Sequence, residues 1–377
     1  MSMFSRRQFI GSLLAMGMPI EVIANMALPD TRSAEREILV SAMGDKKTGY
    51  GFGFMSVAQQ ALAKLTTDFR GHGVSQHPLN PSQVIMYGRR PGNMAIVADV
   101  LQNKIVNRFR VAKNRFFYGH GCFSHDGKTL FTTEGDSITG EGKIGIRDSV
   151  TYQQLGEFDA GGIGPHDLTI MPDGKTLVVA IGGILTRPET GRKKLNLHEM
   201  VSTLTYIDTF TGKKIDEFRV PESKSSIRHL DIASDGTVAI AMQIQRSAMT
   251  HDNPIPLGAI HKPNEDIKLL TEPVPLIRAM NDYLGSVVIN EQTRIAGFTS
   301  PRGNIVGFWN IDTLEFVGYH QMHDVCGIAV NSKHHFMISN SLGEVRELDG
   351  TTLKEYKQRR VVHKHSPWDN HMLAITV

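Results

Sequence analysis

The chain has 377 residues, of which 40% are hydrophobic and 21% charged, with 36 Gly and 16 Pro. These proportions are those of an ordinary globular protein and exclude a disordered or collagen-like chain. The 41 Lys and Arg residues against 38 Asp and Glu residues leave a net charge of only +3. So weak an imbalance does not indicate a nucleic-acid-binding protein.

The first 30 residues have the pattern of an export signal. Arg6 and Arg7 precede an apolar stretch over residues 9–20, and small residues follow it. This order is typical of a twin-arginine (Tat) signal peptide, and the stretch is shorter than a membrane-spanning helix, which takes about 20 residues. An amphipathic helix or a retained anchor is the alternative. We predict a signal peptide at residues 1–30, export by the Tat translocase, and a single periplasmic domain at residues 31–377 without a stable membrane span.

After this segment the sequence consists of short apolar runs separated by Gly, Asp, Asn and Pro, which indicates strands and turns. The clearest unit is an apolar strand, a turn with Asp-Gly and a second strand, because Gly takes the positive φ that a tight hairpin requires. It occurs at residues 122–131, 169–178 and 232–239. Weaker copies occupy residues 74–86, 287–297, 328–338 and 363–377.

These seven copies predict an all-β fold, a seven-bladed β-propeller, with six or eight blades as alternatives. The first six copies are each followed by further strand-like runs, whereas the last has only two strands before the chain ends. Runs at residues 37–42, 50–57 and 61–65 can supply the missing strands. We therefore expect the closing blade to be shared by the N- and C-terminal strands, which removes open sheet edges.

Residues 187–200 interrupt the third copy. The segment is too polar for a core strand and too long for a hairpin turn. Its mixed charge, together with Leu195 and Leu197, favours a folded lid over a flexible linker.

Aligning the copies on their turns places histidines at one shared position. His120 and His229 both lie seven residues before the turn Gly. In copy order the position holds His72, His120, Asp167 with His166 before it, His229, Ser286, Gly327 and His363.

Residues at one position of the first strands should surround the central channel of a propeller. Imidazole and carboxylate groups are ligands for iron, copper, zinc and nickel. We predict a transition-metal site (iron, copper or zinc), or an anion site, at the channel mouth. Its ligands would be His72, His120, His166 and His229, with Asp167 and His363 as weaker candidates. The alternative is that each histidine only caps its own blade through a backbone hydrogen bond.

Other polar residues fall at the predicted blade ends and are candidates for ligand binding. Guanidinium groups suit carboxylate or phosphate, and carboxylates offer hard oxygen ligands. The candidates are Arg89, Arg90, Glu134, Asp136, Asn196, Arg228 and Asp324. Salt bridges within turns are the alternative reading of the charged residues.

Cys122 and Cys326 are the only two cysteines and lie 204 residues apart, which excludes a zinc site built on thiolates. The sequence does not decide whether these two cysteines form a disulfide. The sequence contains no nucleophile elbow, phosphate-binding loop, HExxH, EF-hand loop or CxxCH haem motif.

Short motifs recur through most of the chain after residue 70. They are Gly71-His72-Gly73 with His77-Pro78, Arg89-Arg90-Pro91-Gly92, Thr133-Glu134-Gly135-Asp136 with Gly142-Lys143-Ile144-Gly145-Ile146, Gly162-Ile163-Gly164-Pro165-His166-Asp167, Gly182-Gly183-Ile184, Gly191-Arg192 with Leu195-Asn196-Leu197 and Met200, Ser226-Ile227-Arg228-His229-Leu230, Ser300-Pro301-Arg302-Gly303, Asp324-Val325-Cys326-Gly327 and Trp368-Asp369-Asn370-His371. With these motifs the sequence resembles the bacterial domain-of-unknown-function family 1513. The resemblance implies a Tat-exported periplasmic seven-bladed propeller, encoded near imelysin-type iron-uptake genes. An imelysin-like protein is the partner that it implies.

Three functions remain open because propellers host all of them. The first is a periplasmic binding or scaffold protein for metal acquisition, with iron as the expected metal and a channel mouth lined by His and Arg. The second is an enzyme, a lactonase-like hydrolase or a metal- or quinone-dependent oxidoreductase, that uses the same channel. The third is an interaction platform that presents residues 187–200 to a partner protein.

Overall fold

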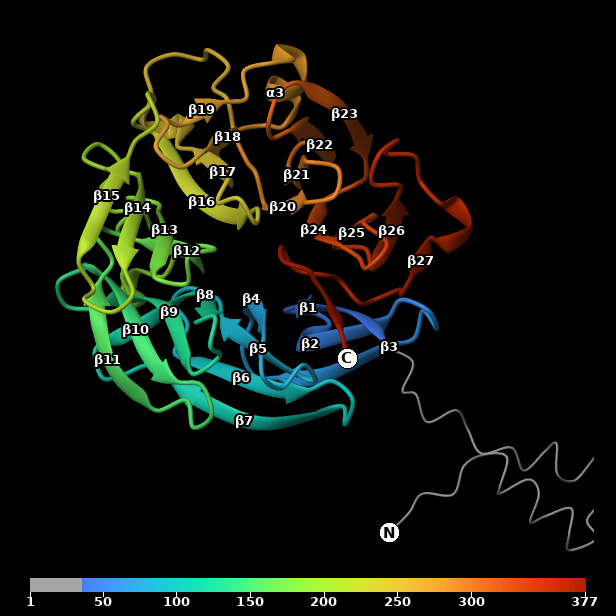
Figure 1. The fold of residues 1–377 in the computed structure, drawn as a ribbon, viewed down its shortest axis with the longest axis horizontal. Helices are drawn as coiled ribbons and strands as arrows, with labels where there is room; N and C mark the ends of the chain where they lie inside the picture. Colours follow the sequence, from blue (N-terminus) through green and yellow to red (C-terminus); the bar gives the residue numbers. More distant parts are fainter. Residues whose placement is uncertain (1–35) are drawn as a thin grey trace, which may run out of the picture. The chain divides into compact units, whose positions relative to one another are not determined.

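The alternation of apolar strands and polar turns builds seven four-stranded antiparallel sheets in the computed structural model, which describes residues 36–377. The sheets are arranged in a ring (Figure 1). Residues of all seven inner strands line one cavity, which we call the central channel. The predicted seven-bladed β-propeller is therefore confirmed. The predicted signal peptide at residues 1–30 lies outside the described residues.

Each blade runs from an inner strand beside the channel to an outer strand at the rim. The inner strands are β4 (Gly71–Gln76), β8 (Arg115–Phe123), β12 (Pro165–Ile170), β16 (Ser225–Ile232), β20 (Ser286–Asn290), β24 (Val325–Val330) and β28 (Leu373–Thr376). The second strands are β5 (Gln83–Gly88), β9 (Thr129–Asp136), β13 (Thr176–Ile181), β17 (Val238–Ile244), β21 (Ile295–Ser300), β25 (Phe336–Asn340) and β1 (Glu37–Asp45).

The third strands are β6 (Met94–Asp99), β10 (Gly142–Asp148), β14 (Thr203–Asp208), β18 (Gly258–His261), β22 (Ile305–Asn310), β26 (Glu344–Leu348) and β2 (Gly49–Ser56). The outer strands are β7 (Lys104–Arg110), β11 (Gln154–Asp159), β15 (Lys214–Phe218), β19 (Lys268–Leu269), β23 (Phe316–Gln321), β27 (Val361–Val362) and β3 (Leu62–Thr67). The short helices are α3 (Val274–Ala279), η1 (Pro188–Thr190), η2 (Arg246–Ala248) and η3 (Lys357–Arg359). Among residues 36–377, no helix has the length and apolar character needed to cross a membrane.

The hydrophobic core lies between neighbouring blades. Phe298 on β21, for example, belongs to one cluster with Leu257 and Ile260 of the preceding blade. The second strands are almost entirely buried, whereas β11 and β23 alternate between partly buried and exposed residues. These two rim strands therefore show the period-two pattern of a half-solvated sheet.

The three Asp-Gly hairpins form as predicted. Gly127, Gly174 and Gly236 have φ values of 69°, 67° and 86° in the turns that join the first two strands of their blades. Because L-residues rarely adopt this region, the glycines fix the hairpins from which the repeat can be recognised.

The closing blade combines both ends of the described chain, as predicted. β1 pairs with β28 on one side and β2 on the other, so that Ile38 lies opposite Ile375 and Ser56. The expectation that residues 363–377 provide two strands is wrong in detail. They provide one strand, β28, and the N-terminal part supplies three.

The insertion at residues 187–200 connects β13 to β14 and is a folded segment. Arg187 Nη1 donates a hydrogen bond to the carbonyl oxygen of Ile138 at 2.9 Å. Lys224 Nζ donates to the carbonyl oxygen of Leu197 at 2.9 Å. These contacts join the insertion to the blades on either side of its own blade, so the segment is not a flexible linker.

Candidate functional site

Four neighbouring inner strands depart from regular pairing where they carry their histidines. The register shifts between Gly71 and Val74 in β4, Phe117 and Gly121 in β8, Pro165 and Asp167 in β12, and Ile227 and His229 in β16. Irregularities of this kind redirect side chains out of the normal alternation. They allow His72, His120, His166 and His229 to project into the channel.

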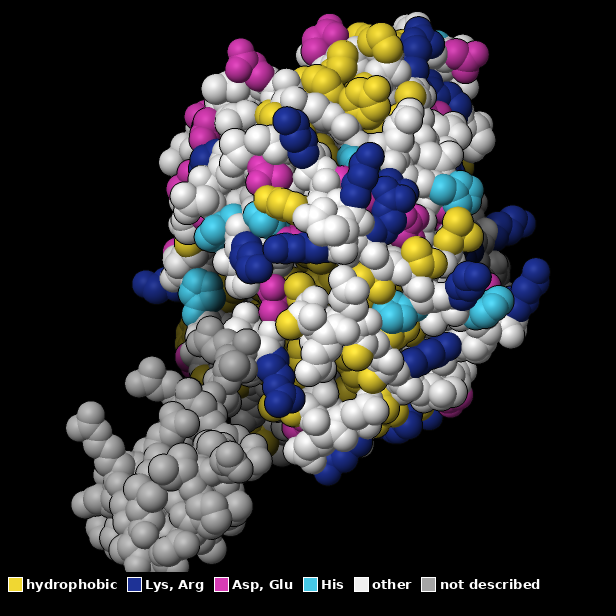
Figure 2. All heavy atoms as spheres, turned by 90° about the vertical axis from the view of Figure 1, so that its right-hand side faces the viewer, with side chains coloured by type: hydrophobic (Ala, Val, Ile, Leu, Met, Phe, Trp, Pro, Cys, Tyr) yellow, Lys and Arg dark blue, Asp and Glu magenta, His cyan; other side chains and the backbone are white. Residues whose placement is uncertain are grey.

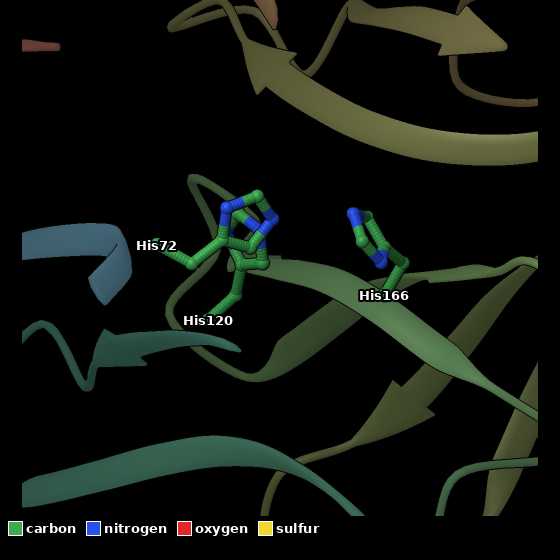
Figure 3. Close-up of side chains that lie close together, drawn as sticks. All are labelled: His72, His120 and His166. Atoms are coloured by element: carbon green, nitrogen blue, oxygen red, sulfur yellow. The ribbon is translucent and has the colours of Figure 1, made fainter. Parts of the chain in front are cut away.

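The four histidines predicted as metal ligands lie together. The ring centroids of His72 and His120 are 4.9 Å apart, and those of His166 and His229 are 4.7 Å apart. Figure 3 shows the rings of His72, His120 and His166 grouped in the space between their strands. All four histidines are buried.

Two glycines allow this close approach. A Cβ atom on Gly119, where φ is +114°, would lie 2.8 Å from Cδ2 of His72. A Cβ atom on Gly73 would lie 2.7 Å from Nδ1 of His120. Any larger residue at either position would displace one of the two imidazoles.

A fifth imidazole comes from His371, in the segment that leads into β28. Its ring centroid lies 4.4 Å from that of His229 and 4.6 Å from that of His72. Ser286 Oγ on β20 is 3.3 Å from His371 Nδ1. A Cβ atom on Gly327 would lie 3.0 Å from Cβ of Met372, so the Gly at the sixth shared position leaves room for this segment.

The prediction that His363 joins the ring is corrected by this arrangement. His363 lies in the connection between β27 and β28, where its backbone N donates to Gly343 O at 2.9 Å. The last copy has no Asp-Gly turn, so the alignment selected the wrong histidine. The motif that ends in His371 was the signal that could have identified the right one.

Asp167 adds a carboxylate to the cluster. Its Oδ1 is 3.1 Å from Nδ1 of His120, and its Oδ2 is 3.7 Å from Nδ1 of His229. Burial opposes ionisation of Asp167, but His120 and His229 hold its pKa far below the ordinary value. Asp167 is therefore ionised at neutral pH and places a negative charge beside the imidazoles. A carboxylate that accepts a hydrogen bond from one ring nitrogen leaves the other nitrogen free for a metal.

Several ring nitrogens of the cluster are buried without a hydrogen-bond partner among residues 36–377. They are Nδ1 of His72, both ring nitrogens of His229, and Nε2 of His120 and His371. Burial is the main cause that lowers the pKa values of His72, His166 and His371 well below the usual value for histidine, and the charges of neighbouring groups are a smaller cause. Burial also lowers the pKa of His229 to about 4. These imidazoles are neutral at pH 7, which is the form that binds metals.

The ligand atoms form three overlapping triads. They are His72, His120 and His166; His72, His229 and His371; and His120, Asp167 and His229. Within each triad the ligand atoms lie within 4.8 Å of one another. Two atoms bound to one metal at about 2.1 Å each are at most about 4.2 Å apart. At most a small inward movement of the rings would therefore be needed to coordinate an ion.

The cluster lies between two cavities of opposite character. Residues after the histidines on the inner strands, including Asp167 and Asp231, line a cavity of about 620 Å³. A second cavity of about 110 Å³ is lined by His72, His166 and Arg228 among others. The prediction placed the site at the channel mouth, whereas the structure places the imidazoles inside the channel, where the four predicted histidines are buried and His371 is partly buried.

The second cavity, which we call the basic pocket, contains three of the predicted ligand-binding residues, Arg89, Arg90 and Arg228. Sequence reasoning missed its other cations, Arg192, Lys194 and Arg302. Arg192 and Arg302 occur in two of the short motifs, Gly191-Arg192 and Ser300-Pro301-Arg302-Gly303, but neither motif aligns with the histidines. Only the ring closure brings these residues to one place.

Glu134, a predicted oxygen ligand, lies inside its blade and away from both cavities. The side chain is fully buried, and its Oε1 lies 2.7 Å from Nη2 of Arg147, which is also buried. Thr132 Oγ1 donates a second hydrogen bond to it at 2.8 Å. The observed role of Glu134 is to neutralise the buried Arg147.

We expect Glu134→Gln to lower the free energy of unfolding by about 3 kcal/mol, because breaking a buried pair leaves the Arg147 charge uncompensated. Urea denaturation measures this loss. The metal content of the folded protein should not change. A variant of normal stability that has lost a bound metal would contradict the structural role.

The structure also places the other predicted ligands outside the two cavities. Asp136 pairs with Arg115 at 2.6 Å. Asn196 Nδ2 donates to Gly183 O at 2.9 Å and so fixes the base of the insertion. Asp324 lies in the turn before β24 with φ of 45°. Cys122 and Cys326 are free thiols.

The comparisons with known proteins identify the family. No curated protein matches the chain. Among solved structures, hydrazine synthase of Kuenenia stuttgartiensis is similar with a TM-score of 0.46 and 16% identity, over 82% of this chain and 73% of that chain. The family described as "Protein of unknown function (DUF1513)" matches residues 65–375. The chain therefore belongs to the DUF1513 family.

Proposed function

We propose that this propeller binds one transition-metal ion in its central channel and serves metal acquisition in the periplasm. The observation that carries the proposal is the group of imidazoles with buried ring nitrogens that have no hydrogen-bond partner among residues 36–377. Leaving such an atom unpaired costs about 1–3 kcal/mol. A metal ion coordinated by several of these nitrogens would offset that cost.

The donor set selects the class of metal. Neutral imidazoles with a single carboxylate suit iron, copper, zinc and nickel, whereas magnesium and calcium prefer oxygen ligands. A soft thiolate is absent from the three triads. Cys122 borders the larger cavity, but burial raises the pKa of its thiol, which keeps it protonated. Iron is the metal we favour among the candidates.

The larger cavity offers a route for a cation. Asp167 and Asp231 both line it, next to His120 and His371. Burial raises the pKa of Asp231 to about 6, so this carboxyl is largely ionised at pH 7. A carboxylate-lined cavity attracts cations toward the cluster. Export by the Tat translocase and an imelysin-like periplasmic partner belong to the same proposal.

The metal content of protein exported through its own signal tests the proposal. The protein should be purified without chelators and without a polyhistidine tag, and then analysed by inductively coupled plasma mass spectrometry. We expect about one equivalent of iron, copper, zinc or nickel. Chelator-treated protein should regain one equivalent on titration. A protein that contains no metal and takes up none in titration would overturn the proposal.

An enzymatic use of the same channel is the second candidate. The cavity of about 620 Å³ beside the cluster is large enough for a small substrate to approach a bound metal. Turnover of lactones or of an electron acceptor by the metal-loaded protein would favour an enzyme. Stoichiometric metal without turnover favours the binding protein.

A further inference from the structure

The basic pocket concentrates positive charge in a small volume. Six cationic side chains line a cavity of only about 110 Å³: Arg89, Arg90, Arg192, Lys194, Arg228 and Arg302. The whole chain has a net charge of only +3. On the face shown in Figure 2, basic and acidic side chains are interspersed.

Carboxylates do not balance this charge. Among residues 36–377, only Arg89 of the six has an ion pair within 4 Å, with Asp369 at 3.4 Å. Asp369 is shared with Arg70, which it approaches more closely, at 2.7 Å. The other five cations lack a carboxylate partner within the described chain. Like charges held this close to one another repel unless an anion lies between them.

The floor of the pocket holds donors without an acceptor. Arg90 Nη1 and Arg228 Nε are buried and have no hydrogen-bond partner among the described residues. Arg228 is only 4% exposed. Burial lowers the pKa of Arg90 to about 10, and the nearby guanidinium groups of Arg192 and Arg89 contribute to the shift. Buried guanidinium donors normally meet an oxygen acceptor.

The rim of the pocket comes from two loops far apart in the sequence. Arg192 and Lys194 belong to the insertion at residues 187–200, and Arg302 follows β21. All three are exposed. The insertion thus brings two of the cations, Arg192 and Lys194, to the pocket.

The pocket also borders the imidazole cluster. His72, His166 and His229 contribute to its lining. Arg228 Nη1 lies 3.4 Å from Nδ1 of His166. A metal ion held by His166 would therefore be close to a buried guanidinium of the same sign, and an anion in the pocket would relieve that repulsion.

From this arrangement we infer that the basic pocket binds a small multivalent oxyanion, a phosphate or a di- or tricarboxylate, and that this anion and the metal ion bind cooperatively. The anion-binding part stands on the pocket alone, and the cooperative part rests on the proposed metal function. The size of the cavity excludes a nucleotide or a peptide as the group it encloses.

Calorimetric titration of chelator-treated protein tests the anion site. Inorganic phosphate and citrate are titrated separately at low ionic strength, and we expect one of them to bind with a stoichiometry of one per chain. Binding of phosphate alone identifies a phosphate site, and binding of citrate alone identifies a polycarboxylate site. Failure of both anions to bind would overturn the inference.

Substitutions of exposed residues at the rim of the pocket test anion binding without removing a buried side chain. Arg192→Gln/Arg302→Gln removes two exposed cations, and we expect it to weaken anion binding at least 10-fold. Arg108→Gln/Arg110→Gln is the matched control, because it removes two exposed arginines of β7, which does not border the pocket. Equal affinity in wild type and in the rim variant would overturn the site. Arg228→Met should abolish binding if its melting curve remains cooperative.

Cooperativity is measured by repeating the anion titration with the metal bound, and the metal titration with the anion bound. The two affinities should rise by the same factor, which we expect to be at least 5-fold, because coupling between sites is reciprocal. Anion binding without metal binding would retain the anion site and reject the metal function. Independent binding of the two ligands would overturn the cooperative part.

Discussion

The double substitution His120→Ala/His229→Ala is expected to abolish stoichiometric metal binding. Each of the three triads contains His120 or His229, so the variant leaves none of them complete. Loss of a residue that only orients a metal ligand costs 10- to 100-fold in affinity. Removal of two direct ligands should therefore weaken binding by more than about 100-fold. Metal analysis after dialysis and competition with a chromophoric chelator both measure this change.

The matched control is His198→Ala/His323→Ala, which removes two exposed imidazoles outside the triads. The control should bind metal as the wild type does. If the cluster variant binds as much metal as the control, the ion is held elsewhere and the channel is not its site. Near-UV circular dichroism establishes that both variants retain their packing.

Acid is expected to destabilise the metal-free protein sharply between pH 6.5 and pH 5. His72, His166, His229 and His371 have pKa values lowered by burial, so the native state keeps them neutral in this window. The unfolded chain binds protons at these positions below its ordinary pKa of about 6.5. The contribution of these imidazoles to the free energy of unfolding is therefore fully present above a pH of about 6.5, and it is lost as the pH falls below that value.

Each such imidazole contributes up to about 1.4 kcal/mol per pH unit, so four of them give a loss of about 4–5 kcal/mol between pH 6 and pH 5. Urea denaturation of chelator-treated protein at several pH values measures the slope. His72→Gln removes one of the four imidazoles, so the free energy of unfolding should then fall by up to about 1.4 kcal/mol less per pH unit. A free energy of unfolding that stays constant from pH 7 to pH 5 would contradict the neutral cluster.

The architecture could be predicted from the sequence because it depends on local patterns. An Asp-Gly turn between two apolar runs forms a hairpin wherever it occurs, as Gly127, Gly174 and Gly236 do here. Repetition of that hairpin then indicates blades, and a ring is the arrangement that removes their open edges. The same regularity predicted that His72, His120 and His229 lie together, because they occupy equivalent positions in their copies, and His166 comes directly before the Asp167 that holds this position in the third copy.

The chain's residues and repeat pattern alone determined the propeller and the convergence of His72, His120, His166 and His229. The contribution of His371, the burial of the cluster and the assembly of the basic pocket were decided only by the tertiary structure. The physical reason is that these features join segments with no shared repeat position: the C-terminal segment, the insertion and the loop after β21. Glu134 shows the same limit in reverse, because only the three-dimensional structure shows that Arg147 neutralises its charge inside the blade.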